Sequence, residues 1–212
     1  MKYILTISIY LLSAFYASAQ IPDKQNLRFK EGIYLNFEQV KNNTPIPKVQ
    51  IRTTLDYSDI SFFDELTQQE HIVFYDNLGN SKSIQTEQIW GYCNKGTLFI
   101  NIHNQFNRIP VLGMISHFTA QYSYTEYRSP YSYSYYDRYS NTAQNKTELR
   151  QYLLDFKTGE IYEFYYKSVQ ALLADDPELM EEYTALSGRK QKKMKFFYIR
   201  KYNEKHPIKF NN

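Results

Sequence analysis

Four histidines, one cysteine and scattered carboxylates are the side chains that could do chemistry, and their spacing points to no defined reaction. His71, His103, His117 and His206 lie far apart in the chain. His103 and His117 could approach each other across neighbouring strands, but a strand histidine is more often a surface residue than a metal ligand. No hydrolase, zinc-protease, phosphate-loop or dinucleotide-binding motif occurs. The sequence therefore predicts no catalytic residue, no metal site and no cofactor.

Three other groups resemble reactive sites only superficially. Cys93 is the single cysteine, no base is placed beside it, and its position at a turn indicates a small residue at a strand end. The segment from Asp76 to Asn80 lacks the later acidic residue of a calcium loop, so a turn is favoured. Asp175 and Asp176 precede a proline, which indicates a helix cap rather than an acid pair.

The elements that would have to position a site are organised around residues 83–102, which we expect to form a β-hairpin. Alternate residues from Ile84 to Tyr92 fall on one face, and the apolar residues after the turn do the same. Gly96 supplies the positive φ that the turn requires. Trp90, the only tryptophan, lies on the apolar face, and we expect the C-terminal helices to bury it.

The predicted fold class is α+β, with a mostly antiparallel meander sheet of about seven strands covered by C-terminal helices. Strand patterns occur at residues 71–75 and 151–164. The period changes from two to 3.6 in the helical C-terminal region, residues 168–206. There Asp176 begins one helix and residues 189–204 are predicted to form the last one.

Length and composition favour one domain over residues 20–212. A hydrophobic fraction of 42% can build a core, and the 22 Tyr and 14 Phe favour β structure with many half-buried rings. Within this domain, residues 121–145 alternate tyrosine with serine and have no apolar face of their own. Such a segment is predicted to be a flexible surface loop.

The same tyrosine-rich segment has a second interpretation as a recognition loop. Tyrosine gives a large contact area at a small cost in rotamer entropy, and arginine adds stacking and anion contacts. A protein or a glycan would suit such a loop. The candidate contacts are Tyr131, Tyr133, Tyr135, Tyr136 and Arg138.

Residues 1–19 are predicted to be a secretory signal peptide. Lys2 precedes a largely apolar run that ends at Phe15, and Ala17 and Ala19 match the small residues that signal peptidase accepts. We therefore expect an exported protein that is periplasmic, associated with the outer membrane, or secreted. Its single cysteine leaves it without an intramolecular disulfide.

Charge is distributed unevenly along the chain. From Arg189 to the end there are nine basic residues and one acid, whereas residues 20–188 hold 15 basic and 21 acidic residues. This basic tail is either a solvated helix face, in part directed toward the acidic body, or a site for an anionic partner. In an exported protein, the expected anionic partners are lipid head groups and acidic glycans, and we do not expect nucleic acid. The candidate contacts are Arg189, Lys190, Lys192, Lys193 and Lys195.

Three stretches, Gly32-Ile33-Tyr34-Leu35, Ile89-Trp90-Gly91-Tyr92-Cys93 and Asp175-Asp176-Pro177-Glu178-Leu179, precede a lysine-rich final helix in that order. Together they resemble a set of uncharacterised secreted or envelope proteins of Bacteroidota type. The resemblance implies an exported location, periplasmic or associated with the outer membrane. It carries over no catalytic residue.

Two classes of function follow from these observations. The favoured class is an exported, non-enzymatic envelope protein that binds a protein or glycan partner, or an anionic membrane surface, through the tyrosine-rich loop and the basic C-terminal helix. The alternative is a hydrolase or a small-ligand-binding protein whose site is assembled from residues distant in sequence. A polar pocket that contains Glu38, Glu87, His103 or His117 would favour the alternative.

Overall fold

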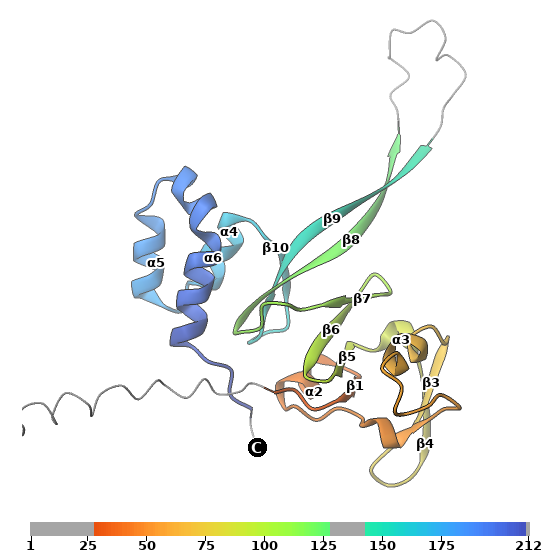
Figure 1. Ribbon diagram of the computed structural model, residues 1–212. Helices are drawn as coiled ribbons and strands as arrows, with labels where there is room; N and C mark the ends of the chain where they lie inside the picture. Colours follow the sequence, from red (N-terminus) through yellow and green to blue (C-terminus); the bar gives the residue numbers. More distant parts are fainter. Residues whose placement is uncertain (1–27, 128–142, 211–212) are drawn as a thin grey trace, which may run out of the picture.

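The computed structural model describes residues 28–127 and 143–210 and confirms the α+β class (Figure 1). Ten strands, rather than about seven, and five α-helices lie in these residues, with three of the helices in the C-terminal part. All strand pairs are antiparallel. The predicted signal peptide lies outside the described residues.

The strands form three sheets. The first has the order β1-β5-β6-β7, the second β2-β3-β4 and the third β10-β9-β8. The strands are β1 (Gly32–Tyr34), β2 (Ile51–Arg52), β3 (His71–Tyr75), β4 (Ser81–Gln85), β5 (Gly91–Asn94), β6 (Thr97–Ile102), β7 (Gln105–Arg108), β8 (Ile115–Tyr127), β9 (Ala143–Asp155) and β10 (Ile161–Glu163).

Two of the helices and two 3-10 turns lie in the N-terminal half, and the other three helices follow β10. The helices are α2 (Phe37–Lys41), α3 (Phe62–Leu66), α4 (Tyr166–Leu172), α5 (Pro177–Thr184) and α6 (Gly188–Lys205), and the 3-10 turns are η2 (Lys48–Gln50) and η3 (Thr86–Gln88). The start of α5 is as predicted, because the Asp176 side chain accepts a hydrogen bond from the Leu179 N–H at 3.2 Å.

Three hydrophobic clusters lie between these elements. Successive residues of one strand face different clusters. In the first sheet Ile33 and Tyr92 contribute to a cluster shared with α3 and the second sheet, whereas Tyr34 and Cys93 contribute to the cluster on the other face. Successive side chains of a strand point to opposite faces. Both faces of this sheet are therefore buried, which accounts for the unbroken apolar runs in β1 and β5.

The base of the β8–β9 hairpin is the other double-sided element. Phe118 and Leu154 pack into the cluster beneath the first sheet, whereas Ile115 and Leu153 pack into the cluster formed with α4, α5 and α6. Figure 1 shows the hairpin between the three helices and the first sheet. The C-terminal helices thus cover the third sheet, whereas the first sheet is covered by the β8–β9 hairpin and α2 on one face and by α3 and the second sheet on the other.

The stretch expected to be one hairpin differs from that prediction in its first arm. The turn η3 separates β4 from β5, so the hairpin consists of β5 and β6, with Lys95 and Gly96 at positive φ in a two-residue turn. Trp90 is only partly buried and lies against Phe37 of α2, with ring centroids 5.9 Å apart. The expectation that the C-terminal helices bury Trp90 is therefore wrong.

The tyrosine-rich segment is also shorter as a loop than expected. Residues 121–127 continue β8 and residues 143–145 begin β9, in register up to the pair Tyr127 and Ala143. The outer part of this two-stranded arm projects from the body of the molecule (Figure 1). The five candidate contacts from Tyr131 to Arg138 lie outside the described residues.

Candidate functional site

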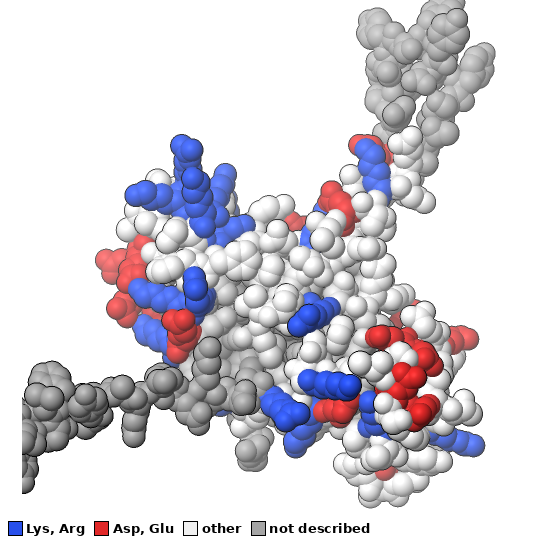
Figure 2. Space-filling model, in the orientation of Figure 1, with Lys and Arg blue, Asp and Glu red and all other residues white. Residues whose placement is uncertain are grey.

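The first turns of α6 carry four exposed basic side chains within five residues. We call Arg189, Lys190, Lys192 and Lys193 the basic surface. Figure 2 shows Lys and Arg gathered at the top left of the view, where α6 begins. None of the ion pairs between described residues involves these four side chains. Lys192 is placed 5.6 Å from the centre of the Tyr166 ring.

The local electrostatics of this helix end are unfavourable for cations. The first turn of α6 contains no acidic residue, and Ser187 at the cap position makes no side-chain hydrogen bond to the helix. The amino end of a helix carries a partial positive charge that favours anions and disfavours Lys and Arg. The basic surface therefore adds positive charge where the helix already has it, and an anionic partner would relieve this repulsion.

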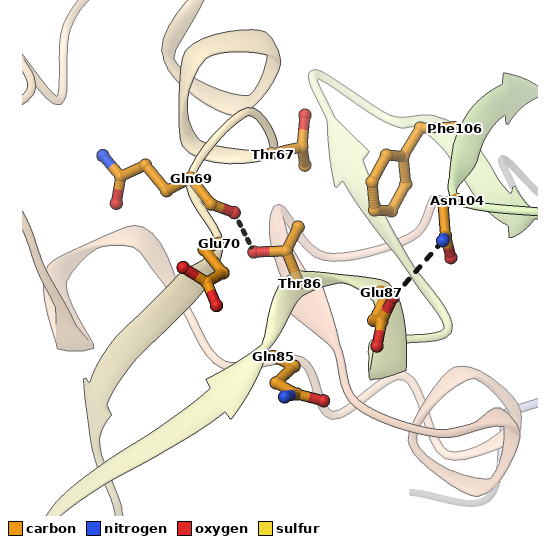
Figure 3. A pocket seen from close by; sticks show the side chains of 8 residues that line it. All are labelled: Thr67, Gln69, Glu70, Gln85, Thr86, Glu87, Asn104 and Phe106. Carbon is orange, nitrogen blue, oxygen red and sulfur yellow. Dashed lines mark hydrogen bonds between the residues drawn. The ribbon is translucent and has the colours of Figure 1, made fainter.

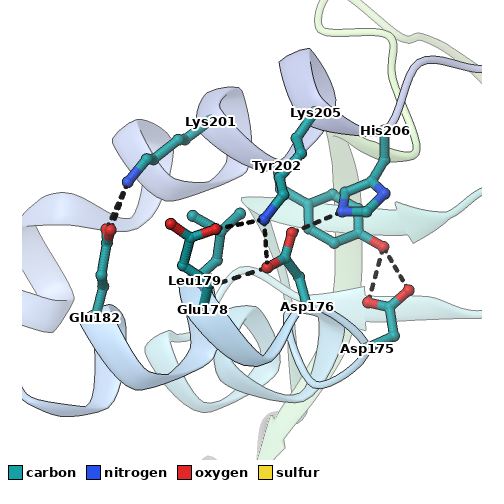
Figure 4. A network of polar contacts seen from close by, with 9 residues as sticks. All are labelled: Asp175, Asp176, Glu178, Leu179, Glu182, Lys201, Tyr202, Lys205 and His206. Atoms are coloured by element: carbon teal, nitrogen blue, oxygen red, sulfur yellow. Dashed lines mark hydrogen bonds and ion pairs between the residues drawn. The ribbon is translucent and has the colours of Figure 1, made fainter.

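The opposite end of α6 has its charge neutralised by α5 (Figure 4). Lys205 contacts Asp176 at 2.9 Å and Glu178 at 2.8 Å, and Lys201 contacts Glu182 at 2.6 Å. The pKa of the Asp176 carboxyl is lowered from 3.8 to about 2. The largest cause is the contact with Lys205, and the second is the contact with His206 at 2.7 Å. The part of the basic tail nearest the C-terminus thus faces the acidic body of the molecule.

Lys195 differs from the other predicted partner contacts of α6 because its side chain is partly buried against Phe164. Its Nζ donates a hydrogen bond to the carbonyl oxygen of Phe164 at 2.7 Å and lies 3.6 Å from the centre of that ring. Burial lowers the pKa of Lys195. This lysine anchors α6 to the end of β10, so we do not count it in the basic surface.

His117 lies beside that lysine and is almost fully buried. Its Nε2 shares a hydrogen bond of 3.1 Å with Gln151 Oε1, and its ring packs edge-on against Phe164 and Phe196. Burial lowers the pKa of His117, the positive charge of Lys195 lowers it further, and the Gln151 bond opposes both. His117 is therefore a neutral packing residue at pH 7.

A second region of interest is a polar pocket of about 280 Å³ between the α3–β3 connection, η3 and the β6–β7 turn (Figure 3). Its lining includes the carboxylates Glu70 and Glu87 and the ring of Phe106. Asn104, at positive φ in the β6–β7 turn, donates a hydrogen bond to Glu87 at 3.3 Å. Carboxylates, amides and one aromatic face are groups that bind a small polyhydroxy ligand.

Of the four residues named in advance for a polar pocket, the structure brings only Glu87 to this one. Glu38 lies exposed on α2 next to Lys41, His103 lies in the β6–β7 turn, and His117 packs under α6. Glu70 and Asn104 were missed because they come from separate segments, and no local sequence pattern joins them.

Metal and thiol chemistry find no support in the described part of the chain. No cluster of three or more His, Cys, Asp or Glu suited to a metal ion lies there. Cys93 is fully buried, and this burial raises the pKa of its thiol to about 11. A thiol of that pKa stays protonated at neutral pH and is a poor nucleophile.

Comparisons with known proteins give no family for this chain. No protein-family model, no curated protein and no solved structure matches it. Within residues 28–127 and 143–210, none of the helices has the length and apolar character required to cross a bilayer. Function must therefore be argued from the basic surface and the pocket themselves.

Proposed function

We propose that this chain is an exported, non-enzymatic protein of the cell envelope that binds an anionic partner through the basic surface. The resemblance to envelope proteins of Bacteroidota type and the signal-like residues 1–19 support an exported location. In that compartment a membrane with anionic lipids is a partner whose negative surface attracts clustered basic residues. The tyrosine-rich arm is proposed as a second contact, with a protein or a glycan.

The contrast between the two ends of α6 carries this proposal. Lys201 and Lys205 are neutralised by acids of α5, whereas the four residues of the basic surface form no ion pair with any described residue. If α6 merely exposed a solvated charged face, there would be no reason for its basic residues to be paired with acids at one end and, among the described residues, unpaired at the other. Each lysine or arginine near an anionic membrane contributes about 1 kcal/mol to binding.

The test is sedimentation with vesicles of phosphatidylcholine that contain phosphatidylglycerol. Because the Debye length falls from about 10 Å at 0.1 M salt to about 3 Å at 1 M salt, binding should be strong at the lower concentration and weak at the higher. Changing the basic surface to Gln should abolish it. Binding that does not depend on salt would overturn the proposal.

A matched control removes the same number of charges elsewhere. One arginine and three lysines that are exposed and lie outside α6 are changed to Gln: Lys30, Arg52, Lys82 and Lys95. This variant should retain vesicle binding. If it loses binding to the same extent as the basic-surface variant, net charge rather than the basic surface is responsible.

Export has its own test. N-terminal sequencing of the protein from its native host should give Gln20 as the first residue, because cleavage is expected after Ala19. A mature chain that still begins at Met1 would contradict the envelope location and leave the basic surface without a membrane partner of this kind.

The polar pocket supports a second candidate function, the binding of a small saccharide. Glu87 can accept hydrogen bonds from hydroxyl groups, and Phe106 offers a ring for a sugar face. Nuclear magnetic resonance titration with envelope-derived disaccharides should shift signals of residues 104–106 and of Glu87. The shifts should vanish in Glu87→Ala and persist in Glu38→Ala, a glutamate outside the pocket.

A further inference from the structure

An apolar groove of about 520 Å³ runs beside the later turns of α6, beginning at Phe196, one turn after Lys193. One wall is the segment between β7 and β8, which includes Val111 and Gly113, and the other wall is α6 with Phe196 and Ile199. The backbone of Val111 is fixed by its pairing with His117, whose N–H donates to the Val111 carbonyl at 2.9 Å. The groove is therefore built from ordered backbone on both sides.

Large apolar side chains remain uncovered in this groove. Phe196 is 45% exposed and Val111 is 38% exposed, although Ile199 beneath them is fully buried. Apolar surface of this kind, bordered by polar residues, is characteristic of a site for an apolar ligand or partner. The ligand that covers it must supply an apolar chain rather than polar groups.

Cations continue along the same face of the helix. Residues three, four and seven positions apart share one side of an α-helix. Lys193 therefore lies over Phe196 and Arg200, and Lys192 also lies one turn before Phe196. Arg200, which lines the groove, is exposed and forms no ion pair with any described residue.

Glu204 is the one carboxylate in the lining, and it gives the groove a direction. It lies one turn beyond Arg200 toward the C-terminal end of α6. An anionic head group would be repelled from that end and attracted to the end with Lys192, Lys193 and Arg200. From Lys192 to Asn203 the helix rises about 16 Å, which gives room for a head group followed by an extended chain.

We propose that this groove holds one acyl chain of an anionic membrane lipid, with the head group on Lys192, Lys193 and Arg200. This inference rests on the proposed function, because the basic surface supplies part of the head-group contact. It adds a specific apolar site to electrostatic adsorption: the lipid chain leaves the bilayer and lies between Val111 and Phe196. Binding of the chain removes apolar surface from water, and the head group neutralises the cations at the start of α6.

The probe is myristoyl lysophosphatidylglycerol below its micelle concentration, measured by titration calorimetry with the full-length mature protein. Glycerophosphoglycerol, which has the same head group and no chain, should bind at least tenfold more weakly. Val111→Asp, which places a charge in the groove, should weaken binding of the lysolipid at least tenfold. Val49→Asp, at a valine that is 83% exposed on η2, is the matched control and should bind as the wild type does.

A second pair of variants tests the head group. Arg200→Gln should weaken the lysolipid severalfold, whereas Arg52→Gln, at an exposed arginine of β2, should not. Photocrosslinking of the wild type with a lysolipid that carries a diazirine in its chain is independent of any variant. It should label residues 109–114 and 196–208. Labelling of other residues overturns the proposal. So does a dimer that covers the groove and does not dissociate when the lysolipid is added.

These outcomes separate the groove from the proposed function. If Val111→Asp and Val49→Asp bind the lysolipid equally, the groove proposal is wrong, and salt-dependent vesicle binding still supports the basic surface. If the basic-surface variant keeps full vesicle binding while Val111→Asp loses the lysolipid, the acyl-chain site in the groove is supported, whereas the electrostatic function and the head-group contacts with Lys192 and Lys193 are wrong.

Discussion

The side-chain amide of Asn203 pairs with the backbone of Ile115 as a neighbouring strand would. Its Oδ1 accepts a hydrogen bond from the Ile115 N–H at 2.8 Å, and its Nδ2 donates one to the Ile115 carbonyl at 2.8 Å. Asn203 belongs to α6 and Ile115 begins β8. Gly113 makes this approach possible, because a Cβ at that position would overlap the Asn203 amide.

Replacing Asn203 should therefore destabilise the protein through unsatisfied backbone groups. Asn203→Ala leaves the Ile115 N–H and carbonyl without partners, and we expect a loss of about 1–3 kcal/mol of unfolding free energy in denaturant melts. Gly113→Ala should cost about 1–3 kcal/mol because of the overlap. In the double variant the overlap disappears. Its loss of unfolding free energy should therefore be smaller than the sum of the losses in the two single variants.

Gly188→Ala is the control for this cycle. No atom lies within 4 Å of a Cβ at Gly188, the first residue of α6. The substitution should leave stability unchanged or raise it slightly, since alanine favours the helix. Equal losses for Gly113→Ala and Gly188→Ala would contradict the role of the close approach.

The ion pairs of Asp176 should appear as acid sensitivity between about pH 4 and pH 2. The carboxyl has a pKa of about 2 in the folded chain, below its unfolded value of about 3.9. It stabilises the fold above the unfolded pKa, and this contribution is lost as pH falls through the folded pKa. Asp176→Asn keeps a helix cap but removes the charge, so its deficit relative to wild type should be full at pH 7 and should shrink as the pH falls from about 4 toward 2.

Glu182→Gln is the comparison for Asp176→Asn. Glu182 also pairs with a lysine of α6, but 41% of its side chain is exposed to solvent. Exposed ion pairs contribute little to stability. A deficit for Glu182→Gln as large as that for Asp176→Asn would show that enclosure of the Asp176 carboxylate is not what matters.

His117 should give a second, milder pH dependence. Its pKa in the folded chain is lowered, mainly by burial, so the unfolded chain binds the proton more readily. Stability should therefore fall as pH drops below the unfolded value of about 6.5. Denaturant melts at pH 8 and pH 5 should show this fall in wild type and in His71→Gln, at an exposed histidine of β3, and a smaller one in His117→Gln.

The projecting arm should be dispensable for folding. Joining Gln121 to Leu149, which are register partners, by an Asn-Gly turn removes an arm whose described contacts are mainly with itself. Tyr122 makes two contacts toward the body that would be lost: Arg150 lies 3.7 Å from the centre of its ring, and the His103 ring packs edge-on at 6.3 Å. We expect the melting temperature to stay within a few degrees. Phe118→Ala, at the buried base, should instead cost about 3–5 kcal/mol.

Local signals explain which elements the sequence could predict. Asp176, Pro177 and Glu178 specify the start of α5 through capping and the helix dipole, and these effects act within one turn. The turn at Gly96 has the same local character. The class α+β and the last helix follow from such signals together with the change of period.

Trp90 shows where this reasoning fails. The alternation that placed it on an apolar face assumed one continuous strand, but η3 interrupts the strand before it. The charge run at the start of α6 likewise did not distinguish Lys195, which is drawn inward by Phe164, from Lys193, which is exposed. The groove and the polar pocket join segments remote in sequence, and single-sequence patterns carry no information on such contacts.

Burial on both faces of the β8–β9 hairpin makes unfolding cooperative. Phe118 and Leu153 lie on opposite faces of the hairpin and in different clusters, so opening the hairpin exposes both clusters at once. The three C-terminal helices can begin to form early from local contacts, but they cannot dock until β8 and β9 meet. We therefore expect a fragment that ends before β8 or begins after β9 to expose apolar surface and to aggregate rather than fold alone.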